Sequence, residues 1–247
     1  MKITVFGASG GIGTHVVDLA TQRGYTVRAV YRSTPKAPPA GQAEILVGPD
    51  IFDPGFAAQA VRGTDVVITA LGPDFAERHN PRTTMISPAD LHQRLARTLI
   101  AAMKDPGAPA RLISVSTGSM GPADAAMNTG QRLLFRFFRT VITPNLGRVG
   151  TDLQAMESEL AATALDWYAP RPVKLTDGPL TGHVHASARF TMKTISRADV
   201  AWYILSLAED PRPGQHRTPI ITSASRGRSR ARPEAEHRAV QRTPSAG

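Results

Sequence analysis

The sequence predicts an α/β fold, a single domain in which a mainly parallel sheet is covered by helices on both faces. Short β-branched or apolar stretches alternate with amphipathic stretches along the chain. The connections between them are short, which is typical of right-handed βαβ units. At 247 residues, of which 41% are hydrophobic, the chain can bury a complete core. We therefore expect a doubly wound sheet.

The first half of this sheet is predicted from three stretches. Residues 2–6 form a β-branched run, and glycines then lead into an amphipathic stretch. The apolar side chains on its helical face are Ile12, Val16, Leu19 and Ala20. Gly24 ends this helix, and residues 26–31 form the second predicted strand. A proline-rich loop at residues 34–41 leads to a third strand at residues 44–47.

The second half alternates in the same way. A helix near residues 56–61 precedes an apolar strand at residues 66–71, and a long helix is predicted over residues 89–103. Residues 111–116 are the fifth strand and residues 166–170 the sixth. A parallel strand covered on both faces should be nearly all apolar, as residues 66–68 are.

The domain is predicted to span residues 1–222, followed by a basic tail at residues 223–247. Six arginines and two glutamates lie from Arg226 onward, so this segment carries +4 of the net charge of +9. It is poor in apolar residues, and we expect it to be disordered. A basic tail can bind nucleic acid through its charge, but no aromatic side chains are interleaved with the arginines. A solvated extension without a nucleic-acid partner is the expectation.

Composition also bears on the compartment. No apolar run approaches the roughly 18 residues that a membrane span needs. The start of the chain leads directly into glycines, without the apolar region of a signal peptide. The chain contains no cysteine, which excludes disulfides and thiolate chemistry. The expected location is the cytoplasm, with no membrane partner.

The most informative motif is Gly7-Ala8-Ser9-Gly10-Gly11-Ile12-Gly13, which follows a strand and opens a helix. Gly7 permits the tight turn, Gly10 lets the backbone approach a pyrophosphate, and Gly13 allows close packing of helix on strand. The phosphates would bind the N–H groups at the helix N-terminus, where the helix dipole also favours negative charge. The motif predicts a Rossmann dinucleotide site formed by Gly7, Ser9, Gly10, Gly11, Ile12 and Gly13.

The end of the second strand indicates which dinucleotide is bound. Sites specific for NAD place Asp or Glu here to bind the ribose 2′-hydroxyl. This chain instead has Arg32, Ser33 and Thr34, with Lys36 nearby. Arg32 can bind a 2′-phosphate through two hydrogen bonds, and Ser33 can add a hydroxyl donor. NADP(H) is therefore predicted in preference to NAD(H).

Further cofactor contacts are expected where the other strands end. Asp50 and Ile51, after the third strand, would surround the adenine. Ala70, Leu71 and Gly72, after the fourth, would line the ribose and pyrophosphate. Ser116 and Thr117, after the fifth, would face the nicotinamide. Each of these segments could instead be an ordinary turn.

These motifs give the chain a family resemblance. It resembles the atypical short-chain dehydrogenases/reductases, and within them the biliverdin reductase B and flavin reductase type of NAD(P)H-binding protein. The residues that carry this are the glycines at 7–13, residues 70–72, Ser116-Thr117, and the segments 24–27, 101–104 and 178–182. The resemblance spans about residues 2–222.

A catalytic residue pair that classical short-chain dehydrogenases/reductases share is missing from this chain. Classical members use Tyr-x-x-x-Lys, in which the lysine lowers the pKa of the tyrosine that acts as general acid. Four residues after each of the tyrosines at 25, 31, 168 and 203, this chain has no lysine. Flavin reductase-type relatives work without the pair, because a conjugated acceptor takes hydride directly and its proton can come from solvent. Their substrate-flanking positions match Ser116, Thr117 and Lys174 here, although biliverdin reductase B relatives carry histidine in place of Lys174.

The resemblance implies an NADPH-dependent reductase of a planar conjugated acceptor such as a flavin, a quinone or a tetrapyrrole. A rival hypothesis is a non-catalytic redox sensor that binds NADP(H), as NmrA-like relatives do. The expected partner is thus a small aromatic molecule, and the expected assembly a monomer or a weak homodimer.

A histidine pair and an amphipathic helix also bear on function. His183 and His185 lie two residues apart and would point to opposite faces of an extended segment, so no metal site is expected. Residues 133–139 form an amphipathic helix with aromatic side chains. It could be a lid over the substrate or a dimer face, and a place in the core is the default expectation.

Overall fold

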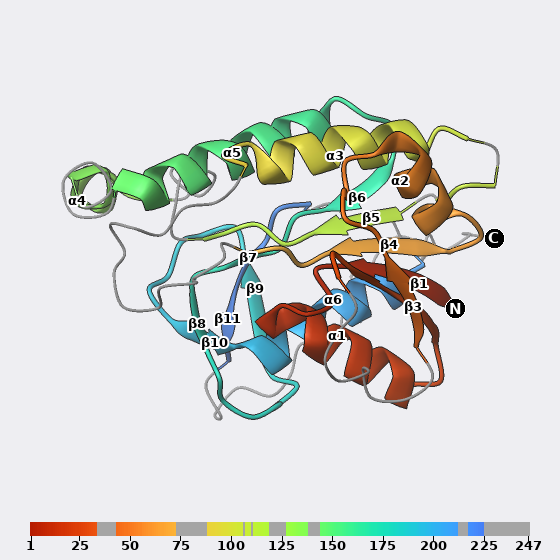
Figure 1. Ribbon diagram of the computed structural model, residues 1–247. Coiled ribbons are helices and arrows are strands. Elements are labelled where there is room, and N and C mark those ends of the chain that lie inside the picture. The colour runs from red at the N-terminus through yellow and green to blue at the C-terminus, as the bar shows by residue number, and fades with distance from the viewer. Residues whose placement is uncertain are drawn as a thin grey trace, which may run out of the picture.

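The centre of the molecule is a six-stranded parallel sheet (Figure 1). The computed structural model describes residues 1–33, 43–72, 88–105, 107–109, 111–118, 127–137, 144–211 and 217–224. The strands are β1 (Lys2–Phe6), β2 (Thr26–Tyr31), β3 (Glu44–Val47), β4 (Val66–Thr69), β5 (Arg111–Ser114) and β6 (Asp166–Tyr168). Their order is β3-β2-β1-β4-β5-β6 and each neighbouring pair is parallel. The predicted Rossmann fold is confirmed, with β4, β5 and β6 each ending two residues earlier than expected.

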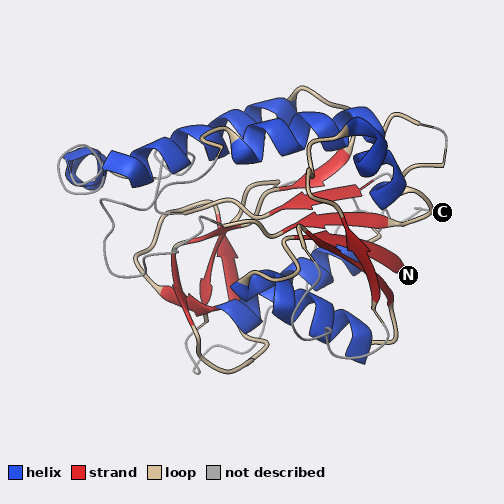
Figure 2. Ribbon diagram, viewed as in Figure 1, coloured by secondary structure: helices blue, strands red, loops and turns tan. Residues whose placement is uncertain are grey.

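Helices cover both faces of this sheet (Figure 2). One face carries α1 (Gly11–Gln22) and α6 (Arg197–Glu209), and the other α2 (Pro54–Val61), α3 (Leu91–Ala102) and α5 (Pro144–Ala161). Alternate residues of one strand enter different cores: Ile3 and Val5 pack with α1 and α6, and Phe6 packs with α2, α3 and α5. Burial on both faces is the reason that β1 and β4 are mostly apolar, and the buried hydroxyl of Thr4 donates to the carbonyl of Ala60.

Five short strands form two further sheets beyond the carboxyl ends of the main sheet, on the left in Figure 2. They are β7 (Arg171–Pro172), β8 (Lys174–Thr176), β9 (Val184–Ser187), β10 (Thr194–Ser196) and β11 (Ile220–Ser223). β11 pairs with β7 in parallel and with β9 antiparallel, and β8 pairs with β10 in parallel. Strands of two to four residues carry too little periodicity to be predicted from sequence. The segment after β6, which includes β7, lies next to the residues that follow β5.

The helix expected at residues 133–139 is α4 (Thr129–Phe137), and its assignment to the core is wrong. The side chains of Leu133, Leu134 and Phe137 are 71%, 61% and 57% exposed. Phe135, in the same helix, does contact the rest of the domain: its ring makes an edge-to-face contact with Phe190, at 5.5 Å between ring centroids. The amphipathic pattern correctly predicts a helix here, but it does not show which part of the structure, if any, covers the apolar face of that helix.

Several predictions fall outside the described residues. The proline-rich loop with Thr34 and Lys36 does so, as does the basic segment from residue 225 onward. The last described contact is the backbone N–H of Ala224, which donates to the carbonyl of His183. In the described part of the chain, no helix is long and apolar enough to cross a membrane.

Candidate functional site

The predicted dinucleotide site lies where the strand order reverses. β1 has β2 on one side and β4 on the other, so the chain winds in opposite directions from this point. In open α/β sheets, ligands bind at the carboxyl ends of the strands at such a position. Here the segments that follow β1 and β4 are the glycine loop and Ala70–Gly72, and a side chain added to Gly7 would lie 2.8 Å from the carbonyl oxygen of Ala70.

The three spaced glycines are each required by a close backbone approach. Gly7 has φ +82°, which favours glycine. A Cβ on Gly10 would lie 3.2 Å from the Gly7 carbonyl oxygen, and a Cβ on Gly13 only 2.0 Å from the same atom. The start of α1 therefore sits directly on the turn after β1. This cradle, which side chains would fill, fits a dinucleotide pyrophosphate.

The first turn of α1 offers donors for that pyrophosphate. Gly10 is the N-cap, and no side chain in the described part of the chain caps the helix there. The hydroxyl of Thr14 turns back to the carbonyl oxygens of Ala8 and Gly10, at 3.1 and 3.0 Å. Ser9 and Gly11 are exposed, whereas the Ile12 side chain enters the core and leaves only its backbone for a ligand. Uncapped N–H groups at the positive end of a helix form an anion site.

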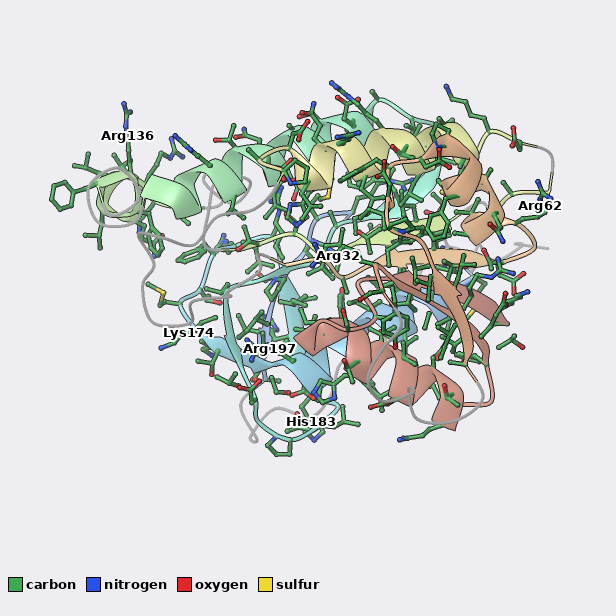
Figure 3. The ribbon with its side chains drawn as sticks, viewed as in Figure 1. Arg32, Arg62, Arg136, Lys174, His183 and Arg197 are labelled. Carbon is green, nitrogen blue, oxygen red and sulfur yellow. The ribbon has the colours of Figure 1, made fainter. Side chains whose placement is uncertain are left out.

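The residues predicted to bind the adenosine end of the cofactor differ in their exposure to solvent. Arg32 (Figure 3) and Ser33 are both exposed where β2 ends. Asp50 accepts a hydrogen bond from the backbone N–H of Phe52 at 2.8 Å, a local turn that leaves a second oxygen for a ligand. Ile51 is 7% exposed and packs with the α2, α3 and α5 core. Their roles toward the cofactor stay predictions.

Next to Leu71 lies a buried pair of polar residues, His92 and Asp152, that was not predicted from the sequence. Nδ1 of His92 lies 2.7 Å from Oδ2 of Asp152, and Nε2 of His92 lies 3.4 Å from the carbonyl oxygen of Leu71. Asp152 also accepts the backbone N–H groups of His92 and Gln93 and so caps α3 from α5. Burial raises the pKa of Asp152, but these hydrogen bonds outweigh burial and hold that pKa below its ordinary value. The pair fixes the edge of the site at Leu71.

The end of β5 is held by a second network. The hydroxyl of Ser116 donates to Oε1 of Glu157 at 2.6 Å. Arg171 donates to both oxygens of the same carboxylate, with Nε at 3.0 Å from Oε1 and Nη2 on Oε2. All three side chains are largely buried. Glu157 and Arg171 were not predicted, although an acidic residue within the apolar face that Leu153, Met156 and Leu160 form on α5 was a usable signal.

Residues 116–118 lie alongside residues 170–172. The backbone N–H of Ser116 donates to the carbonyl of Pro170 at 3.0 Å, and that of Gly118 to the carbonyl of Pro172 at 2.8 Å. Thr117, between them, is 8% exposed. Lys174 follows two residues after Pro172 and is exposed (Figure 3). The structure thus brings the segments of all three predicted catalytic residues into one neighbourhood.

Comparison with known proteins identifies the family and supports the fold. The profile of a family described as NAD(P)H-binding matches residues 7–211. The Bacillus subtilis (strain 168) protein YwnB is 24% identical over 232 residues, covering 91% of this chain and 100% of YwnB. Among solved structures, the Escherichia coli O157:H7 anaerobilin reductase ChuY has a TM-score of 0.67 at 23% identity, covering 90% of this chain and 97% of ChuY.

A second solved structure shares the fold over a similar length. SP1627 of Streptococcus pneumoniae TIGR4, a candidate NADH-flavin reductase, has a TM-score of 0.66 at 22% identity and covers 91% of this chain and 100% of its own. At these identities the structural likeness establishes the fold. The family match includes the glycine cradle and every strand of the main sheet after β1. The chain belongs to the NAD(P)H-binding family.

Proposed function

We propose that the protein is an NADPH-dependent reductase that transfers hydride to a planar conjugated acceptor, such as a flavin, a quinone or a linear tetrapyrrole. The observation that carries the proposal is the position of Ser116 and Thr117. These buried hydroxyl residues lie at the same edge of the sheet as the glycine cradle, two strands away, which is where a dinucleotide held by its pyrophosphate extends its nicotinamide. A bound nicotinamide supplies the hydride.

The network around Ser116 defines what this residue can do. Its hydroxyl hydrogen is committed to Glu157, so its oxygen is left as an acceptor toward a ligand N–H, such as that of a carboxamide. Arg171 fixes the carboxylate and therefore the rotamer of Ser116. This arrangement orients a ring without donating a proton to it. A conjugated acceptor can take its proton from solvent, so holding the two rings in near-attack geometry is the main task of the protein.

Lys174 would act on the acceptor. It is exposed beside the segment that lies against residues 116–118, and an ammonium group there attracts a phosphate or a propionate. The activities named for ChuY and SP1627, an anaerobilin reductase and a candidate NADH-flavin reductase, support an acceptor of this chemical class.

The proposal is tested by steady-state oxidation of NADPH with FMN, FAD, menadione and biliverdin as separate acceptors. We expect turnover with at least one of them. If the protein binds NADPH but reduces none of the four, the reductase proposal is wrong. A sensor that binds NADP(H) without catalysis would then be the better account.

The first prediction concerns cofactor choice. Arg32→Ala should weaken NADPH binding by roughly 10- to 100-fold, because a hydrogen bond to a charged group contributes about 1.5–3 kcal/mol. NADH lacks the 2′-phosphate, so its affinity should change little. Fluorescence titration with both cofactors measures the difference. Equal losses for NADPH and NADH would show that Arg32 does not bind the 2′-phosphate.

A second prediction separates orientation from acceptor binding. Thr117→Ala should lower kcat by about 10-fold, well short of the roughly 100-fold or more expected for the loss of a general acid. Lys174→Ala should instead raise the KM for FMN with little change in kcat, because charge attraction acts on binding. Initial rates with FMN at saturating NADPH give both constants. A Thr117→Ala variant that lost about 100-fold or more in kcat would contradict the orienting role.

A further inference from the structure

The side chain of Arg197 lies against Gly11, the first residue of α1, next to the glycine cradle. Arg197 is the first residue of α6, which packs beside α1 on the same face of the sheet. A Cβ on Gly11 would lie 2.7 Å from Cδ and 2.9 Å from Nε of Arg197. The arginine side chain therefore occupies the space beside the first residue of α1 that a Cβ at position 11 would take. Figure 3 shows Arg197 beside the start of α1, on the side where Lys174 also lies.

This is an electrostatically unusual place for a cation. The N-terminus of a helix carries a partial positive charge, and an arginine beside it is unfavourable unless an anion lies between them. The first turn of α1 contains no acidic residue. The carboxylate that offsets the charge of Arg197 comes from Asp177, which accepts a hydrogen bond from Nη1.

The ion pair with Asp177 can be exchanged. The side chain of Asp177 is 89% exposed and that of Arg197 is 29% exposed. Exposed ion pairs contribute little net free energy, so a ligand anion of higher charge can displace Asp177 from the guanidinium group. A pyrophosphate offers two charges and a geometry that matches the two parallel N–H donors of arginine.

The backbone that carries Arg197 is held rigidly. The neighbouring Ser196 caps α6 by accepting from the N–H of Asp199 at 3.0 Å, and its hydroxyl donates to the carbonyl of Pro179 at 3.1 Å. Buried Asp199 accepts the N–H groups of Thr181 and Gly182 at 2.7 and 2.9 Å. Residues 179–182, within the 178–182 segment that contributes to the family resemblance, thus hold the start of α6 in place.

We propose that Arg197 is a cofactor-binding residue that grips the pyrophosphate from the side opposite the glycine loop, and that Asp177 is its partner in the free protein. The proposal rests on the proposed dinucleotide binding and extends it to a residue 184 positions from Gly13. Because NADPH and NADH share the pyrophosphate, Arg197 should contribute equally to both, unlike Arg32.

The test is isothermal titration of the full chain with NADPH, NADH and adenosine 2′-monophosphate, which lacks a pyrophosphate. Arg197→Gln should weaken NADPH and NADH by similar factors of about 10-fold or more, and leave adenosine 2′-monophosphate unchanged. Arg197→Lys keeps the charge without the paired donors and should recover part of the loss. Arg32→Ala is the matched control with the opposite pattern, affecting NADPH and adenosine 2′-monophosphate but not NADH.

A second pair of variants tests the exchange of partners. Asp177→Asn removes the competing carboxylate and should tighten both dinucleotides by up to about 5-fold. Glu209→Gln is its control: Glu209 pairs with Arg23 at the other end of α6, so the substitution changes the net charge equally but far from the cradle. It should leave affinity unchanged.

These titrations distinguish a failure of the role proposed for Arg197 from a failure of the proposed function. Wild-type affinity for NADPH and NADH in a folded Arg197→Gln variant would overturn the role of Arg197 alone. An equal loss for adenosine 2′-monophosphate would also overturn it, because the defect would not lie at the pyrophosphate. If the wild-type protein bound neither dinucleotide, the reductase and sensor functions would both fail, whatever the variants did.

Discussion

Gly13→Ala is expected to destabilise the fold severely. The new Cβ would lie 2.0 Å from the carbonyl oxygen of Gly7, 2.8 Å from its carbonyl carbon and 3.1 Å from Cα of Ala8. All three are backbone atoms of the turn that joins β1 to α1, so no side-chain rotation can relieve the clash. Overpacking of this kind costs about 3 kcal/mol or more. For a chain of this length that corresponds to a fall in Tm of about 6–12 °C, measured by circular dichroism.

Gly11→Ala is the matched control, two residues earlier in the same helix. Its nearest neighbours would be Cδ, Nε and Cζ of Arg197, the outer part of a flexible side chain that can move away. Alanine also favours the helix over glycine by up to about 1 kcal/mol. Its Tm should therefore stay close to that of the wild type. If Gly13→Ala were as stable as Gly11→Ala, the close approach of α1 to the turn after β1 would be wrong.

The main sheet and its cofactor end could be predicted because their determinants are local. The β-branched residues of β1, the glycines that follow and the apolar face of α1 are contiguous in the chain, and the spacing of Gly7, Gly10 and Gly13 specifies their packing. Fold rules then place the ends of β4 and β5 at the same edge. For this reason the sequence predicts that residues 70–72 and 116–117 follow neighbouring strands at one edge of the sheet, and the structure agrees.

The partners that hold the site could not be predicted, because they come from distant positions. His92 and Asp152 are 60 residues apart in sequence, and Ser116 and Glu157 are 41 apart. Arg197 reaches Gly11 from the last helix of the domain. Periodicity shows which face of α5 or α6 is buried, but the pairing of one charged side chain with another depends on how the helices cross the sheet. Such contacts follow from tertiary packing, which a single sequence does not display.

The second large effect is expected at Glu157. Glu157→Gln leaves the guanidinium of Arg171, whose side chain is 13% exposed, without its ionic partner. Removing one partner of a buried ion pair typically costs about 3–5 kcal/mol, since the remaining charge is buried and uncompensated. The free energy of unfolding, measured by urea denaturation at neutral pH, should fall by about this amount. Turnover should fall as well, because the amide oxygen of glutamine is a weaker acceptor than a carboxylate and Arg171 no longer holds it through two hydrogen bonds, so the hydroxyl of Ser116 is oriented less firmly.

A double variant distinguishes the ion pair from a simple loss of packing. In Glu157→Gln/Arg171→Met no buried charge is left behind, so the double variant should be more stable than Glu157→Gln alone. Replacing buried ion pairs by uncharged side chains of similar volume is often nearly neutral for stability, so a substantial recovery is expected. Turnover should not recover with stability, because the hydroxyl of Ser116 would still lack a fixed carboxylate acceptor. If the two substitutions were simply additive in their effect on the free energy of unfolding, Glu157 and Arg171 would not be coupled. The network that orients Ser116 would then have to be assigned to other residues.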